Sequence, residues 1–103
     1  MYSRVTLLEI DTVRIGVDDA IKVFTTEVLP RLEAQEGFEG VLVLSTPEGK
    51  GMIVSLWRTE QEAASAAGFA SGLLEEYVAL FAAPPGREYY EVSVAELPAA
   101  RRS

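Results

Sequence analysis

Two short apolar runs near the middle of the chain carry its clearest pattern. They are 41–44 (VLVL) and 52–57 (MIVSLW), and both are rich in β-branched and aromatic residues, which is typical of strands. The segment between them contains Thr46, Pro47 and Gly49. Pro suits a turn because it fixes φ near −65°, and Gly because it tolerates a positive φ. The pattern predicts a β-hairpin with a short loop.

Both faces of this predicted hairpin are apolar. One phase of the alternation carries Val41, Val43, Ile53 and Trp57. The other phase carries a second apolar set, namely Leu42, Leu44, Met52, Val54 and Leu56. An antiparallel sheet that is apolar on both faces needs cover on both sides.

The segment before the hairpin predicts a strand and a helix. Residues 2–10 have apolar side chains on both phases and are expected to form the first strand. An apolar stripe then recurs at three- and four-residue spacing, which indicates an amphipathic helix; its members are Ile21, Phe24, Val28 and Leu32. We expect Asp18 to be the N-cap and Gly37 the C′ residue of this helix. Pro30 should kink or restart it, because Pro removes one backbone hydrogen bond.

The segment after the hairpin predicts a second helix and a last strand. Thr59 and Glu62 have the spacing of a capping box, and an apolar stripe continues to Ala83. Two glycines, Gly68 and Gly72, predict a break between Ala67 and Leu73, because Gly disfavours a helix interior. A turn at 84–86 precedes an alternating strand at 90–94, in which Tyr90 is expected to face the core.

The element order β-α-β-β-α-β predicts a ferredoxin-like α+β fold. Short connections and right-handed crossovers arrange it as a four-stranded antiparallel sheet with two helices on one face. We expect a single domain over residues 1–97 and a short C-terminal tail at 98–103. Two helices cover only one face, so the other apolar face should be an interface. The simplest closed solution is a homodimer packed sheet to sheet.

Composition excludes several classes of site. The 103 residues include no Cys, no His and no Asn, and the formal net charge is −7. Without Cys there are no disulfides, thiolate metal sites or Cys nucleophiles. An acidic chain is a poor partner for nucleic acid or anionic membranes. We expect no metal site, because carboxylates with metal-ligand spacing are also missing. No apolar run is long enough to span a membrane, and the expected compartment is the cytoplasm.

Other ferredoxin-like proteins fit the residues less well. An RNA-recognition motif needs aromatic residues on its open sheet face in basic surroundings, whereas this hairpin is aliphatic and the chain acidic. A metallochaperone of this fold needs paired cysteines, which the chain lacks. A regulatory amino-acid-binding module is a further alternative, although such modules are usually fused to an enzyme.

The hairpin and its flanks resemble one family. Pro30, the stretch Gly37-Phe38-Glu39-Gly40 before the second strand, and Trp57-Arg58-Thr59 after the third are similar to the antibiotic biosynthesis monooxygenase-type family of dimeric α+β barrels. The similarity spans residues 2–97. It implies a homodimer in which each protomer holds a pocket between helices and sheet. Some members oxidise aromatic polyketides without a cofactor, and others degrade haem.

The resemblance does not extend to the haem-degrading members. Those proteins use a His on the second helix as the iron ligand, together with an Asn near the first strand, and this chain has neither residue type. Only Trp57 has a counterpart. Imidazole and thiolate are common protein ligands of haem iron, so the sequence argues against haem degradation, and we expect no cofactor.

Three side chains are candidates for lining a substrate pocket. Trp57 is either a core anchor between the third strand and the second helix or a pocket wall that stacks on a flat substrate. Tyr77 is either a core tyrosine or a phenol that points into the pocket. Arg14 is either a solvated charge or a partner for a phenolate or carboxylate. The sequence identifies no catalytic residue.

Two functional hypotheses remain open. The first is a cofactor-independent monooxygenase acting on a flat aromatic substrate held by Trp57 and Tyr77. Because His is absent, a carboxylate or the substrate's own phenolate would have to act as the general base. The second is a non-catalytic dimeric module that binds a small ligand or a protein. The family resemblance favours the first hypothesis, and the missing imidazole favours the second.

Overall fold

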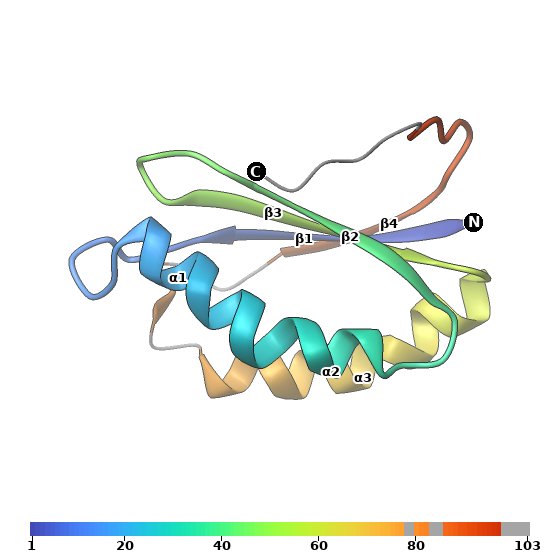
Figure 1. The fold of residues 1–103 in the computed structure, drawn as a ribbon, viewed down its shortest axis with the longest axis horizontal. Coiled ribbons are helices and arrows are strands. Elements are labelled where there is room, and N and C mark those ends of the chain that lie inside the picture. The colour runs from blue at the N-terminus through green and yellow to red at the C-terminus, as the bar shows by residue number, and fades with distance from the viewer. Residues whose placement is uncertain (78–79, 83–85, 98–103) are drawn as a thin grey trace.

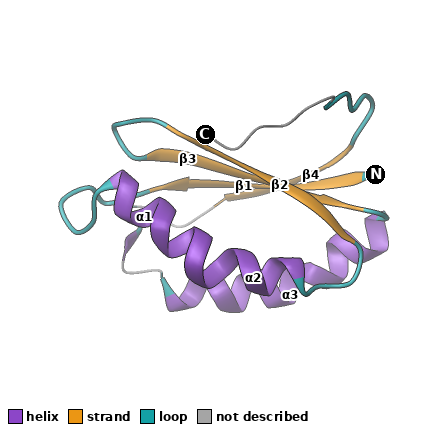
Figure 2. Ribbon diagram, viewed as in Figure 1, coloured by secondary structure: helices purple, strands orange, loops and turns teal. Residues whose placement is uncertain are grey.

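Four strands form one antiparallel sheet, and all the helices lie on one of its faces (Figures 1 and 2). The computed structural model describes residues 1–77, 80–82 and 86–97. The elements in chain order are β1 (Tyr2–Glu9), α1 (Val17–Val23), η1 (Phe24–Val28), α2 (Leu29–Glu33), β2 (Phe38–Ser45), β3 (Lys50–Trp57), α3 (Glu60–Glu76) and β4 (Gly86–Glu91). The strand order is β2-β3-β1-β4. This arrangement confirms the predicted ferredoxin-like βαββαβ fold. Within the described ranges, no helix combines the length and apolarity needed to cross a membrane.

The two apolar phases of the hairpin lie on opposite faces of the sheet, as predicted. Trp57 faces the helices and forms the core with Leu32, Ala63 and Ala66. Register then places the other members of its phase on the same helix-facing side. The second phase lies on what we call the open face. The side chains that the register places on this face, from all four strands, are Ser3, Val5, Leu7, Glu9, Leu42, Leu44, Lys50, Met52, Val54, Leu56, Glu88 and Tyr90.

The hairpin turn is the predicted one, but a β-bulge near its start was not predicted. The backbone N–H of Thr46 donates to the carbonyl of Lys50 at 2.9 Å, and Gly49 has a positive φ of 100°. At the other end of β2, Phe38 pairs with Trp57 and Gly40 with Leu56, so the register shifts between Phe38 and Gly40. Residues on one face of a regular strand are two apart, but Phe38 is three residues before Val41. The extra residue of the bulge allows both side chains to lie on the helix-facing side.

The first helical segment runs as one rod through α1, η1 and α2 (Figure 1). Its N-cap is Gly16 and not Asp18, which instead lies in the first turn, where its charge still meets the positive end of the helix dipole. The predicted restart at Pro30 is confirmed. A π-helical turn precedes it, and the N–H of Leu29 donates to the carbonyl of Phe24. Pro30 then lies at the start of α2, where a missing N–H costs little.

Gly37 does not cap this rod, because α2 already ends at Glu33 with Ala34 as its C-cap. Gly37 lies instead in the turn before β2, with φ of 83°. Its carbonyl accepts a hydrogen bond from the N–H of Arg58 at 2.8 Å, which joins the start of β2 to the end of β3. The prediction that Gly37 is the C′ residue of the helix was therefore wrong, although Gly37 does adopt a positive φ.

The predicted break in the second helix does not occur. α3 is continuous over Glu60–Glu76, although Gly68 and Gly72 lie within it. Two glycines each cost about 1 kcal/mol relative to Ala. The burial of Ala63 and Ala66 against Trp57 offsets this cost. The helix ends at Glu76 and so does not reach the predicted Ala83, which lies outside the described residues together with Pro84 and Pro85.

The last strand is shifted toward the N-terminus relative to the prediction. β4 covers Gly86–Glu91, and Val94 is exposed beyond it. Tyr90 pairs with Ser3 on the open face and is 49% exposed, so the expectation that it faces the core was wrong. Its hydroxyl donates to the carboxylate of Glu88 at 2.7 Å. Val92 still donates its N–H to the carbonyl of Met1 at 3.1 Å, but the chain beyond it turns away from the sheet (Figure 1), so the predicted alternation does not continue as a strand.

Candidate functional site

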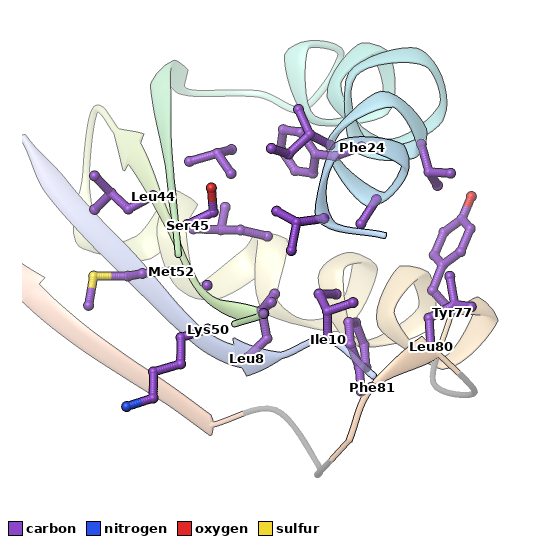
Figure 3. Close-up of a pocket in the computed structure, with 18 of the residues that line it drawn as sticks. Leu8, Ile10, Phe24, Leu44, Ser45, Lys50, Met52, Tyr77, Leu80 and Phe81 are labelled. Carbon is purple, nitrogen blue, oxygen red and sulfur yellow. The ribbon is translucent and has the colours of Figure 1, made fainter. Parts of the chain in front are cut away.

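A cavity lies between the helical rod and the end of the sheet at which β1 ends and the hairpin turns (Figure 3). It encloses about 120 Å³, which is of the order that accommodates one benzene-sized ring. Apolar residues dominate the lining. From the helical rod come Val17, Ala20, Ile21, Phe24 and Val28, and from the sheet come Leu8, Ile10, Val43 and Ile53.

Local structure explains why these side chains converge. Phe24 and Val28 are the first and last residues of the π-helical turn η1, and both contribute to the lining. A π turn is wider than an α turn and often occurs at functional sites. On the far side, Ile10 forms an isolated bridge with Phe81, and both line the cavity. The cavity is therefore formed where two irregular pieces of backbone meet the sheet.

Polar groups are few in the lining. The lining includes Ser45, Lys50 and Tyr77, and Figure 3 shows the ammonium group of Lys50 directed away from the other lining side chains. The hydroxyl of Tyr77 donates to the carboxylate of Glu27 at 3.1 Å. Burial of the phenol, followed by the hydrogen bond to Glu27, raises the pKa of Tyr77 above its ordinary value. Tyr77 therefore carries its proton at neutral pH and acts as a donor.

The structure brings only one of the three predicted site residues to this cavity, namely Tyr77. Trp57 is 1% exposed and lies outside the lining. Its indole N–H donates to the hydroxyl of Ser55 at 2.9 Å, and its ring packs edge-on against Phe38 with centroids 5.6 Å apart. This is the geometry of a core anchor. Arg14 lies in the loop after β1, where it pairs with Asp11 at 3.4 Å and its side chain is 62% exposed.

Two charged residues with unusual positions were not singled out from the sequence. Glu27 lies between Phe24 and Val28 of the apolar stripe. Nothing in its spacing indicates that its carboxylate contacts Tyr77, fifty residues away in the chain. Arg4 stands among the apolar residues of β1 and is 5% exposed. Its position among the apolar residues of the first strand could have identified it as unusual, because charged residues are rarely fully buried unless they are paired.

The cavity does not fit a haem group. Haem iron is held by imidazole, thiolate or, less often, Tyr or Met, and the chain contains no His and no Cys. The Tyr77 hydroxyl at the cavity is already engaged with Glu27. Within the described ranges, no group of three or more acidic residues forms a metal site.

Comparisons with known proteins identify the fold. No family model matches the sequence, and no curated protein matches it. Solved structures do match. A protein of unknown function from Nitrosomonas europaea, NE2512, is 21% identical with a TM-score of 0.75, over 96% of this chain and 95% of that one.

Two further structures carry functional names. A monooxygenase from the ActVA-Orf6 gene of Streptomyces coelicolor, solved with the ligand Nanaomycin D, is 19% identical with a TM-score of 0.70, over 95% of this chain and 92% of that one. A second Nitrosomonas europaea protein, provisionally named an antibiotic biosynthesis monooxygenase, is 16% identical with a TM-score of 0.72, over 91% of this chain and all of that one. The chain therefore has the fold of the antibiotic biosynthesis monooxygenase-type proteins, the family that its hairpin resembles in sequence.

Proposed function

We propose that this chain binds a small, flat aromatic molecule in the cavity between the helical rod and the sheet. The observation that carries the proposal is the predominantly apolar lining, which includes Tyr77 with its hydrogen bond to Glu27. Ligand sites are typically apolar concavities with a few polar groups that fix orientation. A protein of the same fold was solved with the ligand Nanaomycin D. The enclosed volume suits one ring, and a larger ligand would extend past the edge.

The test is a titration with toluene, followed by isothermal calorimetry or by amide chemical shifts. Binding should perturb lining residues such as Ala20. The variant Ala20→Phe fills the cavity from α1 and should abolish the binding. Ala64→Phe is the matched control, because Ala64 is exposed on α3 and does not line the cavity. If toluene causes no heat and no shifts in the wild-type protein, the proposal is wrong.

Oxidation of a bound phenol is a second candidate function, and the contact between Tyr77 and Glu27 favours it. Glu27 is an exposed carboxylate that reaches the cavity through its hydrogen bond with the Tyr77 hydroxyl, and it can accept a phenolic proton as the general base in place of His. Overall, such a reaction converts one phenol and one O₂ into one quinone and one water, so no external reductant is needed. Oxygen uptake in the presence of 1-naphthol would test it, with Glu27→Gln expected to lose the uptake while still binding toluene.

We also propose that two copies associate through the open face. Leu42 and Leu44 are 46% and 51% exposed there, and Leu7 is exposed on the same face, across Met52 from Leu44. Exposed apolar patches of this kind mark interfaces, and a sheet-to-sheet two-fold dimer would cover the patch without leaving a further copy of it exposed. The proposed unit is one domain over residues 1–97, with 98–103 as a tail, and the proposed compartment is the cytoplasm, which suits a chain without Cys.

A further inference from the structure

Arg4 is a buried cation with two unpartnered side-chain nitrogens. It is 5% exposed, and its Nε and Nη2 atoms find no acceptor among the described residues. It lies at the centre of the sheet, on β1, opposite Ser55 of β3. Because Ser55 is two residues from Trp57 on the same strand, both Arg4 and Ser55 are on the helix-facing side. An uncompensated buried charge is strongly destabilising. An anion bound to Arg4 would remove this cost.

The two unpartnered atoms indicate which kind of anion fits. Nε and Nη2 form one edge of the planar guanidinium, and their N–H bonds on that edge run parallel. This edge matches the two oxygens of a carboxylate in a bidentate pair. A carboxylate presents two acceptor oxygens on one side and can take both hydrogen bonds at once, each to its own oxygen. The geometry of the unpartnered groups therefore favours a carboxylate.

The strand register places Arg4 one diagonal step from the cavity lining. Along the helix-facing side of β1, Leu8 lines the cavity and Thr6, the next residue inward, pairs with Ile53, another lining residue. Arg4 follows Thr6 on the same side and is the diagonal neighbour of Ile53. Diagonal neighbours across antiparallel strands lie about 7–8 Å apart, within reach of long side chains. Nε and Nη2 are both covered by neighbouring atoms, so a ligand whose apolar body lies in the cavity can direct its end group past Ile53 to Arg4 only by displacing that cover.

We propose that the ligand is an apolar carboxylic acid, with its ring or chain in the cavity and its carboxylate on the Nε–Nη2 edge of Arg4. This inference rests on the proposed binding function and adds the chemical class of the ligand. It also accounts for a buried cation in a chain of net charge −7, where the overall field repels anions and a local cation is needed to hold one.

Toluene and phenylacetate form a matched pair of probes, since they differ only by the carboxylate. The variant Arg4→Met removes the charge and keeps an apolar side chain of similar length. We expect phenylacetate affinity to fall by about tenfold or more, because hydrogen bonds to charged groups are the strong ones, whereas toluene affinity should stay within about twofold. Arg14→Met is the charge-matched control at an exposed position and should leave both affinities unchanged.

Each outcome decides between the two proposals. If toluene binds but phenylacetate binds equally well to the wild type and to Arg4→Met, the carboxylate inference is wrong and the binding function stands. If neither probe binds the wild type, both fail. Circular dichroism checks that Arg4→Met is folded. A second measurement needs no variant: the side-chain Nε–H resonance of Arg4 should shift with phenylacetate and not with toluene, and an unchanged resonance at saturation would overturn the inference.

Discussion

Gly37 lies directly against the carboxylate of Glu62, so closely that a Cβ on residue 37 would overlap it. The same carboxylate accepts hydrogen bonds from Arg58 and from the hydroxyl of Thr59, while the hydroxyl of Thr59 accepts the N–H of Glu62 at 3.1 Å. Of the two hydrogen bonds of the predicted capping box, the one from the N–H of Glu62 to the Thr59 hydroxyl is therefore present. The Glu62 side chain, in contrast, pairs with Arg58, which lowers the pKa of Glu62 and raises that of Arg58.

The first prediction concerns the replacement of Gly37. Gly37→Ala should destabilise the protein by more than about 1 kcal/mol, because the positive φ of 83° is strained for Ala and the added methyl displaces Glu62. Gly68→Ala is the matched control, since a Cβ at Gly68 meets open space on a helix, and it should stabilise by about 1 kcal/mol. Urea unfolding at one protein concentration measures both. Shifts of the same sign would contradict the prediction.

The second prediction concerns the hydrogen bond between Trp57 and Ser55. Ser55→Ala leaves a buried indole N–H without an acceptor, and this should cost about 1–3 kcal/mol. The hydroxyl of Ser55 also donates to the carbonyl of Arg4 at 3.2 Å, so the change loosens β1 as well. Ser93→Ala, at an exposed position, should change stability by less than about 0.5 kcal/mol. Equal midpoints for the two variants in thermal unfolding would refute the expected role.

The third prediction separates the two interpretations of Trp57. As a core anchor, Trp57→Phe should lower stability by about 1 kcal/mol or more and leave the toluene affinity unchanged. As a pocket wall, the same variant should weaken toluene binding. The burial of Trp57 outside the cavity lining favours the first outcome. A loss of affinity without a loss of stability would favour the second.

The fourth prediction concerns alkaline pH. The pKa of Tyr77 is raised by burial and then by Glu27, so the folded state holds this proton at a pH where the unfolded chain has already lost it. The resulting stability is fully present below the unfolded pKa of about 10 and is lost as pH rises through the folded pKa. The pKa of Tyr90 is likewise raised, by its hydrogen bond to Glu88 and then by burial.

The wild-type protein should therefore lose stability between about pH 9 and about pH 11, an interval that contains the unfolded tyrosine pKa. Tyr77→Phe should lose less over this interval, Tyr90→Phe should also lose less, and the double variant should lose least. Urea midpoints at the two pH values measure the difference. An identical loss in the wild type and in the double variant would show that neither phenol keeps its proton on folding.

The fifth prediction concerns the open face. The wild-type protein should have the mass of two chains at micromolar concentration, and Leu42→Glu should have the mass of one, because a carboxylate buried in an apolar interface is left unpaired. Val13→Glu, in a loop where Val13 is 94% exposed, should remain dimeric. Light scattering after size exclusion measures both masses. A wild-type protein that elutes with the mass of one chain would rule out the proposed dimer.

The fold was predictable because its signals are local. The two phases of the hairpin, the Pro30 restart and the Thr46 turn each depend on neighbouring residues. The cavity was only partly predictable. Tyr77 was predicted from its place on an apolar stripe. Glu27 and Arg4 are notable only because of their surroundings in the folded chain, which residues distant in the sequence provide, and no local sequence pattern predicts such contacts. The predicted helix break failed for a related reason, since tertiary burial outweighed the intrinsic cost of Gly68.

The two-sided apolar character of β2 has a consequence for folding. In most sheets a one-residue slip moves the hydrophobic set into water, and this penalty enforces the correct pairing. Here a slip would exchange one apolar face for another, so hydrophobicity alone discriminates poorly between correct and slipped hairpins. The discrimination must come from the two ends of β2, namely the bulge next to Phe38 and the turn closed by Thr46 and Gly49. Variants that lengthen this turn should therefore populate misaligned, aggregation-prone chains even where the folded protein tolerates them.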